Sequence, residues 1–169
     1  SNPISVSVVL DKDIVDWNEN INKIFGFILM SENKTIYFLK AELANSAKAF
    51  KEWLALNNNK DSLDSKSMYV CCDRLNLKCG LFSYDFLLAS YLINSDKASD
   101  LKDALGQLDV ELELDPIKRI VQSVYLMDLK KKDMVDRLTK ENQIKLLTDV
   151  ELPLAKTLAS MGLRECPSI

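Results

Sequence analysis

The chain has 169 residues, a length that suits one domain with a buried core. Its hydrophobic content of 47% and formal net charge of −3 argue against a disordered chain and against nucleic-acid binding driven by overall charge. Histidine is absent and the four glycines are far apart, which excludes Ser-His-Asp hydrolysis, Cys-His nucleophiles, most zinc enzymes and glycine-rich phosphate loops, and leaves carboxylate chemistry with a divalent metal.

The first part of the chain is expected to form strands. Residues 4–10 (ISVSVVL) are β-branched and apolar, the profile of a strand buried on both faces. Residues 22–31 and 34–40 flank a short polar turn and indicate a hairpin. A helix is predicted over 42–56, and MYVCC (68–72) is predicted to be a fourth short strand, on which the two adjacent cysteines would face opposite sides.

The second part is expected to be helical. Ser83 is predicted to cap one short helix, Ser99 and Asp100 are predicted to cap another, and Asp115, followed by proline, is predicted to start a long one. A last helix is expected over 142–161, bent or restarted at Pro153. Strands followed by helices predict a mixed α/β fold.

Three further features complete the pattern. Residues 129–145 are locally basic, which is typical of a solvated helix face and also of a patch that contacts phosphate or another subunit. No apolar run could cross a membrane and no secretion signal is recognised, so a cytoplasmic protein without membrane contact is expected. The cysteines lack CxxC spacing and are predicted to be buried free thiols: Cys71, Cys72, Cys79 and Cys166.

Three segments stand out, in this order: SYDFLLASYLIN (83–94), ASDLKDAL (98–105) and LLTDVELPLAKTLASMGL (146–163). Together they resemble bacterial DNA polymerase I of family A, the last one resembling the helix that leads to the polymerase thumb. The resemblance implies an α/β, ribonuclease-H-like 3′–5′ exonuclease fold, with a mixed sheet of about four or five strands in the N-terminal half followed by a helical C-terminal half.

The resemblance also implies a domain organisation. We expect one exonuclease-like domain over 1–163, strand-rich in 1–72 and helical in 83–163. Residues 164–169 would form a tail or the start of a linker toward the thumb.

Proofreading members of this family hold two metal ions with carboxylates from three motifs, as in-line attack of water on a phosphodiester requires. The first motif, D-x-E at the end of the opening strand, is matched by Asp11 and Asp13. Residues i and i+2 of a strand face the same way, so both carboxylates could point at one site. The alternative is a solvated strand end.

The other two motifs are predicted to be lost. N-x-x-x-D after the fourth strand aligns with 76–80 or 71–75, neither of which ends in Asp, and Asp73 is out of register. For Y-x-x-x-D on a late helix, Tyr125 is followed by Asp128 only three residues later, and Gln122 or Ser123 stands where the acid is expected. Tyr125 is equally a candidate core or interface aromatic.

The resemblance, with these departures, implies a vestigial exonuclease domain that supports the polymerase domain of the same parent chain. It would have no intact catalytic residue and no cofactor of its own, whereas the parent polymerase would use Mg²⁺. DNA would be contacted weakly or indirectly, through the candidate residues Lys130, Lys131, Lys132 and Arg137.

Two alternatives from other classes stay open. One is a weak divalent-metal-dependent 3′–5′ exonuclease that uses Asp11 and Asp13 with a displaced third acid, Asp73 or Asp128. The other is a protein-binding module that recruits a partner through its helical half.

Overall fold

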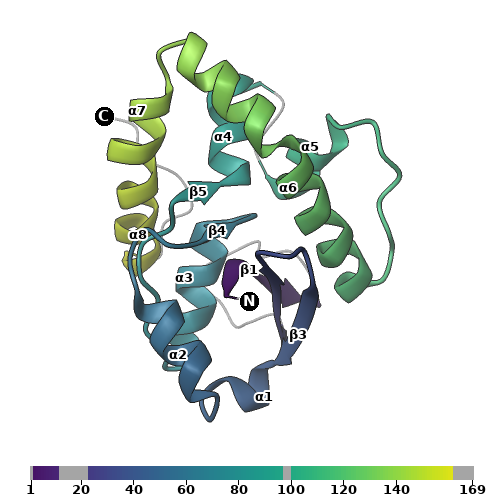
Figure 1. Ribbon diagram of the computed structural model, residues 1–169, viewed down its shortest axis with the longest axis vertical. Coiled ribbons are helices and arrows are strands. Elements are labelled where there is room, and N and C mark those ends of the chain that lie inside the picture. The colour runs from purple at the N-terminus through teal and green to yellow at the C-terminus, as the bar shows by residue number, and fades with distance from the viewer. Residues whose placement is uncertain (1, 12–22, 97–99, 162–169) are drawn as a thin grey trace.

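The computed structural model describes residues 2–11, 23–96 and 100–161 and contains a five-stranded sheet covered by helices (Figure 1). The strands lie in the order β3-β2-β1-β4-β5. The pairs β1–β2 and β2–β3 are antiparallel, whereas β1–β4 and β4–β5 are parallel, so the sheet is mixed as predicted. The strand bounds are β1 Pro3–Leu10, β2 Ile24–Ser31, β3 Ile36–Lys40, β4 Asp61–Ser62 and β5 Tyr84–Asp85.

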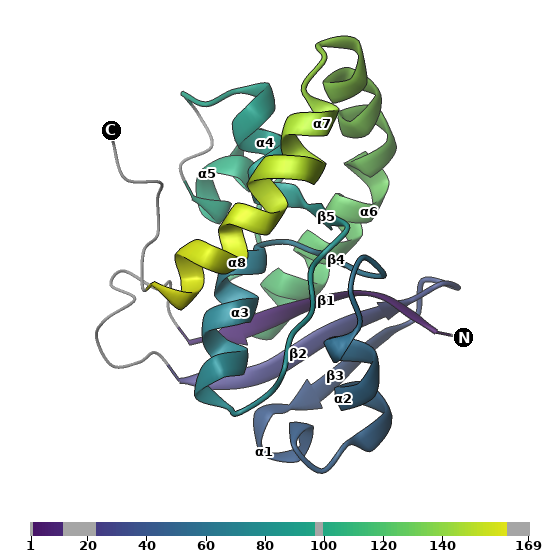
Figure 2. The same ribbon diagram turned by 90° about the vertical axis from the view of Figure 1, so that its left-hand side faces the viewer.

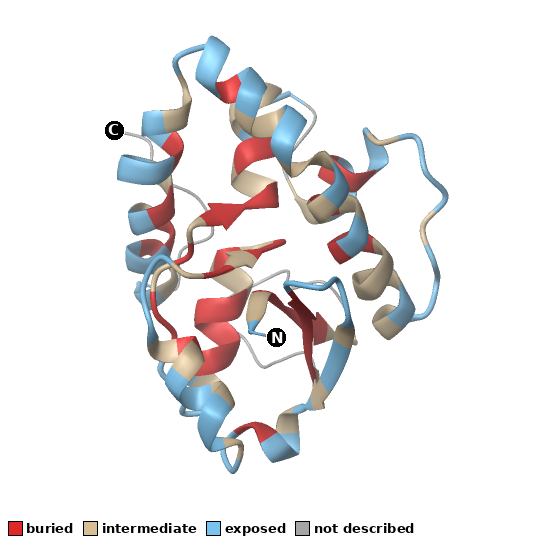
Figure 3. Cartoon of the chain, viewed as in Figure 1, coloured by how far each residue is buried: buried red, intermediate tan, exposed pale blue. Residues whose placement is uncertain are grey.

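The central strand β1 is buried on both faces, as its sequence predicted. Val6 and Val9 are fully buried. The small polar residues Ser5 and Ser7, which flank Val6 in the sequence, are buried as well. Helix α3 and helix α6 both contact β1, and Figure 2 shows the sheet between them. Buried residues are concentrated in β1, β2 and α3 (Figure 3).

Helices α4 to α7 form the upper part of the molecule in Figure 1, whereas α1 and α2 lie at its lower end. No helix among the described residues is long and apolar enough to cross a membrane. The bounds are α1 Ala41–Ala44, α2 Lys48–Ala55, α3 Ser65–Arg74, α4 Phe86–Ile93, α5 Leu101–Gly106, α6 Pro116–Lys140, α7 Ile144–Leu146 and α8 Leu152–Ser160.

Two predicted helices are interrupted. The helix expected over 42–56 is divided into α1 and α2. The last predicted helix contains one π-helical turn, Leu147–Glu151, between α7 and α8. Pro153 follows this turn and has no backbone N–H to donate to a carbonyl within it, so the wider turn takes the place of the predicted bend.

The predicted strand at 68–72 is wrong, because these residues lie in helix α3. Asp64 caps this helix by accepting hydrogen bonds from the amide and the hydroxyl of Ser67. The five residues from 68 to 72 are all buried, since α3 packs between the sheet and α8. A helix buried on nearly all sides has an uninterrupted apolar sequence, which resembles that of a buried strand.

Helix α4 begins later than predicted. Asp85, rather than Ser83, is its N-cap, and its Oδ1 accepts a hydrogen bond of 2.9 Å from the amide of Leu88. Tyr84 and Asp85 form the short strand β5 immediately before the helix. The predicted caps at Asp100 and Asp115 are confirmed, each accepting a hydrogen bond from the amide three residues later.

Candidate functional site

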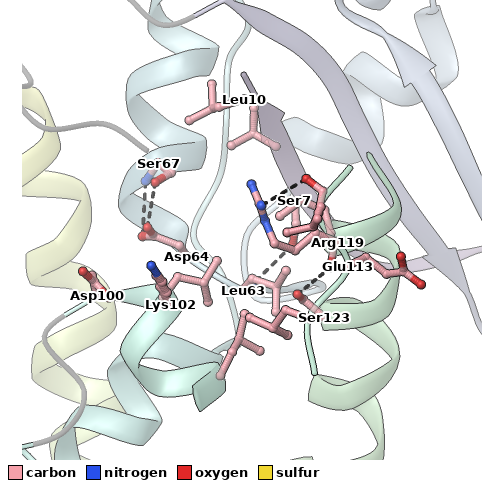
Figure 4. Close-up of a pocket in the computed structure, with 16 residues that line it drawn as sticks. Ser7, Leu10, Leu63, Asp64, Ser67, Asp100, Lys102, Glu113, Arg119 and Ser123 are labelled. Atoms are coloured by element: carbon pink, nitrogen blue, oxygen red, sulfur yellow. Dashed lines mark hydrogen bonds between the residues drawn. The ribbon is translucent and has the colours of Figure 1, made fainter. Parts of the chain in front are cut away.

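A cavity of about 330 Å³ lies at the end of β1, between the start of α3 and helices α5 and α6 (Figure 4). It is the place where a ribonuclease-H-like site is expected, because the first predicted motif follows β1. Its polar lining comes from five parts of the chain: Ser7 of β1, Asp64 and Ser67 at the start of α3, Asp100 and Lys102 at the start of α5, Glu113, and Arg119 and Ser123 of α6.

Asp11 follows β1 directly and has one carboxylate oxygen without a partner. Its amide donates a hydrogen bond of 3.1 Å to the carbonyl of Lys23. Its Oδ1 is buried and has no hydrogen-bond partner among the described residues. Such an oxygen is well suited to a proton or a cation. Asp13 lies outside the described residues, so its pairing with Asp11 stays a prediction.

The acid that follows the fourth strand is Asp64, which the sequence analysis missed. Because β4 is Asp61–Ser62 and not 68–72, the segment Lys60–Asp64 (KDSLD) takes the place of the second motif, with Lys60 where the motif has Asn and Asp64 where it has Asp. Asp73 is exposed near the other end of α3, about 13 Å along the helix from Asp64. The structure therefore does not bring Asp73 to the cavity.

Both carboxylate oxygens of Asp64 are used in capping. Oδ2 accepts a hydrogen bond of 2.7 Å from the Ser67 hydroxyl, and Oδ1 accepts one of 3.4 Å from the Ser67 amide. Figure 4 shows this pair at the edge of the cavity. The geometry makes Asp64 a helix cap that borders the site, and a metal ion bound there would compete with Ser67.

Helix α6 presents a hydroxyl and a guanidinium to the cavity. Ser123 is fully buried and donates a hydrogen bond of 2.6 Å to the carbonyl of Arg119. Arg119 donates to the carbonyl of Leu114 at 3.4 Å. The neighbouring Gln122 holds the loop before α6, because its side-chain amide bonds the backbone of Glu111 and Glu113. Neither position proposed for the third acid carries one.

Tyr125 and Asp128 lie on another face of α6, against the β2–β3 turn. The Tyr125 hydroxyl donates to the carbonyl of Lys34 at 3.3 Å, and Asp128 Oδ1 lies 2.8 Å from Lys34 Nζ. Tyr125 is 46% exposed, so it is not a core residue. Neither Asp128 nor Asp11 is among the residues that line the cavity, whereas Asp64 is.

The donor set of this site does not fit two magnesium ions. Within the described part of the chain, no three His, Cys, Asp or Glu side chains form a group able to hold a metal. Arg119 and Lys102 line the same cavity as Asp64 and would repel a second cation. The unpartnered oxygen of Asp11 is one candidate cation ligand, and its predicted partner Asp13 lies outside the described residues.

The four candidate DNA contacts differ in their surroundings. Lys131 forms an ion pair of 2.7 Å with Asp61 and lies over the ring of Tyr84, so it joins α6 to the sheet. Arg137 pairs with Glu141 one turn later on the same helix. Lys132 is exposed and Lys130 is half-buried.

The mixed sheet, the helices on both of its faces and the acids at the ends of β1 and β4 define a ribonuclease-H-like domain. Residues 12–115 match the family described as DNA polymerase I, ribonuclease H-like domain, and the chain belongs to this family. The predicted fold and the predicted resemblance are therefore confirmed.

Two known proteins are similar to this chain over nearly its whole length. DNA polymerase I of Bacillus subtilis (strain 168) is 28% identical over 179 residues, which cover 94% of this chain and 20% of that protein. The chain thus spans a fifth of the length of this relative. The structure titled "POL domain of Pol1 from M. smegmatis complex with DNA primer-template and dNTP" is similar in fold, with a TM-score of 0.72, 20% identity and coverage of 93% of this chain and 27% of that one.

Proposed function

We propose that the chain is the vestigial 3′–5′ exonuclease domain of a family A DNA polymerase, where it supports the polymerase domain and has no nuclease activity of its own. This proposal rests on which side chains α6 contributes to the cavity lining. At the position where a third carboxylate is required, the helix presents Ser123 and, one turn earlier, Arg119. A hydroxyl and a fixed positive charge cannot replace an anionic metal ligand.

The proposed partners follow from family membership. The first is the polymerase domain of the same parent chain, which would use Mg²⁺ for DNA synthesis while this domain requires no cofactor. The second is DNA, contacted weakly through Lys130, Lys131, Lys132 and Arg137. Of these, Lys131 and Arg137 also form ion pairs, with Asp61 and Glu141 respectively.

The nuclease half of the proposal is tested with the purified chain, Mn²⁺ and a 5′-labelled single-stranded oligonucleotide. We expect the rate of 3′-end shortening to equal that of the double variant Asp11→Ala/Asp64→Ala. A proofreading family A polymerase serves as the assay control. Metal-dependent shortening that disappears in either single variant would overturn the proposal.

The supporting role is tested in a polymerase that contains this chain. Removal of residues 1–161 is expected to lower the temperature at which polymerase activity is lost, since the apolar surface shared with this domain becomes exposed. An unchanged inactivation temperature would contradict a supporting role.

One observation favours the alternative of a weak metal-dependent nuclease. The unpartnered Oδ1 of Asp11 is buried at the end of β1, close in sequence to the predicted partner Asp13. A single ion held there would polarise a phosphate without the second ion that activates water. Calorimetric titration with Mn²⁺ separates the two cases: the alternative requires saturable binding that is lost in Asp11→Asn.

A further inference from the structure

The last helical segment of the chain has apolar side chains on two opposite faces. It consists of α7, the π-helical turn Leu147–Glu151 and α8, which continue one another along the left-hand edge of the molecule in Figure 1. Its inner face packs mainly on α3 and α4 and carries four buried residues: Leu147, Leu152, Ala155 and Leu158. A surface helix needs only one apolar face, whereas a helix that is apolar on both faces is normally covered on both.

The outer face of this segment is exposed to solvent. It is formed by Leu146, Val150, Pro153 and Met161, and the first, second and fourth of these are 36%, 46% and 60% exposed. Thr157 lies on the same face and is also exposed. Figure 2 shows the segment in front of the other elements, and in Figure 3 exposed residues follow its outer edge. A row of apolar side chains is therefore left without a covering element among the described residues.

The π-helical turn keeps this row straight. Leu146 and Met161 are 15 residues apart, slightly more than the about 14.4 residues that four α-helical turns contain. A π-helical turn is wider than an α-helical one and takes up the difference. With an α-helical turn in its place, the two side chains would lie about 60° apart around the helix axis. Because π-helical turns are rare and occur frequently at functional sites, this alignment favours a surface with a function.

We propose that the outer face is the contact surface for the polymerase domain of the same parent chain, an inference that rests on the proposed function. This chain covers only 20% of the similar Bacillus subtilis polymerase and 27% of the similar POL-domain chain. In a parent chain of that size, most of the folded protein lies outside this domain and can cover the face. The same segment carries exposed Lys145, Asp149 and Lys156, which suit the polar rim of an interface.

The small size of the outer face favours a linked domain over a second copy of the chain. Four apolar side chains offer a few hundred Å² at most, whereas a stable complex of separate proteins buries about 800 Å² on each partner. Two domains of one chain need less contact area, because their covalent link keeps them at a high effective concentration. A domain joined to this one is therefore the occupant that fits the area.

The first test measures whether the outer face is covered in a polymerase that contains this chain. Val150 is replaced by Cys, and its alkylation by N-ethylmaleimide is followed by mass spectrometry in the polymerase and in the isolated chain. We expect alkylation to be about tenfold slower in the polymerase, because a covered thiol is inaccessible to the reagent. The matched control is Leu43→Cys on α1, an equally exposed site at the lower end of Figure 1 that should react at the same rate in both proteins.

The second test measures how much the contact stabilises the polymerase. The triple variant Leu146→Gln/Val150→Thr/Met161→Gln should lower the temperature at which polymerase activity is lost by about 5 °C. The isolated triple variant should unfold at the wild-type temperature, because all three side chains are exposed in this domain. The matched control, which should change neither temperature, carries the same kinds of substitution at three other exposed residues: Leu43→Gln, Leu56→Gln and Val110→Thr.

The possible results separate this inference from the proposed function. If removal of residues 1–161 lowers the inactivation temperature but the triple variant behaves like its control, the supporting role stands and the outer face is the wrong surface. If neither change has an effect, the supporting role fails and the contact surface fails with it.

Three further results would also overturn the inference. Equal alkylation of Val150→Cys in the polymerase and in the isolated chain would mean that the face is uncovered. Loss of stability in the isolated triple variant would mean that the face belongs to the fold of this domain. A dimer of the isolated chain that the triple variant abolishes, measured by sedimentation velocity, would make a second copy the occupant.

Discussion

Lys131 Nζ lies 2.7 Å from Asp61 Oδ2, and this ion pair joins the long helix α6 to the two-residue strand β4. The Asp61 side chain is 14% exposed and that of Lys131 is 41% exposed. Burial raises the pKa of Asp61, and the hydrogen bond and charge of Lys131 oppose this shift. Lys131 Nζ also lies over the ring of Tyr84, 5.3 Å from its centroid.

Replacing Lys131 and replacing Asp61 should therefore lower the free energy of unfolding by different amounts. Lys131→Ala leaves a buried carboxylate without a counter-charge and should lower the free energy of unfolding by about 2 kcal/mol. Asp61→Asn should cost less, because the lysine can turn toward solvent. The exposed pair Lys34–Asp128 is the matched control, and Lys34→Ala should cost less than about 1 kcal/mol. Urea denaturation of the three variants checks this order; equal losses would contradict it.

The second prediction concerns the cap of α3. Asp64→Ala removes the acceptor for the Ser67 amide and hydroxyl and should lower the free energy of unfolding by about 1 kcal/mol. Asp64→Asn keeps one acceptor oxygen and should lose clearly less. Thermal unfolding followed by circular dichroism measures both. If the two substitutions were equally harmless, the role of Asp64 as a cap would be wrong.

The third prediction is that alanine substitutions at two glycines change the stability of the protein in opposite directions. A Cβ atom at Gly80 would lie 2.1 Å from the carbonyl oxygen of Leu56, and backbone cannot move aside easily, so Gly80→Ala should destabilise the protein by about 2–3 kcal/mol. Gly106, in α5, has no atom within 4 Å of such a Cβ. Gly106→Ala should stabilise the protein by up to about 1 kcal/mol. Urea midpoints that move in the same direction would contradict this prediction.

Asp85 gives a prediction about pH. Its Oδ2 accepts hydrogen bonds from the amide and hydroxyl of Ser65, and its Oδ1 accepts one from Leu88. Burial, with the nearby charge of Asp64, nevertheless raises the pKa of Asp85 to about 7 from its ordinary 3.8. The folded protein then holds this proton more tightly than the unfolded chain. The stabilisation is complete at the acidic end and is lost as the pH rises through about 7.

The measurement compares the wild type with Asp85→Asn, which does not titrate. The difference in unfolding free energy between the two proteins should decrease between about pH 4.5 and pH 7.5, by on the order of a few kcal/mol. A difference that instead grows with pH would mean that the three hydrogen-bond donors outweigh burial and hold the ionised carboxylate.

The sequence pattern predicted those strands and helix caps that are formed by residues close together in the chain. The β1–β3 meander follows from apolar runs separated by a polar turn, and the caps at Asp100 and Asp115 follow from residue type alone. Strands β4 and β5 have two residues each and leave no pattern to detect. Helix α3 was mistaken for a strand because tertiary packing buries it on nearly all sides.

The errors in the candidate site have the same origin. If residues 68–72 formed a strand, the acid that follows it would be Asp73, nine residues beyond Asp64. On α6, Ser123 and Tyr125 are two residues apart and point about 200° apart around the helix. Spacing alone could not tell which of them faces the cavity, and only the packing of α6 on β1 decides it.

The unequal length of the strands has a consequence for the order in which the protein folds. Strands β1 to β3 are long and pair with their neighbours in the chain, whereas the parallel pairing of β1 with β4 joins Ser5 to Asp61 across more than fifty residues. Closing so long a loop for so few backbone bonds is unfavourable until α3 and α6 are in place. The meander is therefore the natural nucleus, and the parallel edge is the last and least protected part of the sheet.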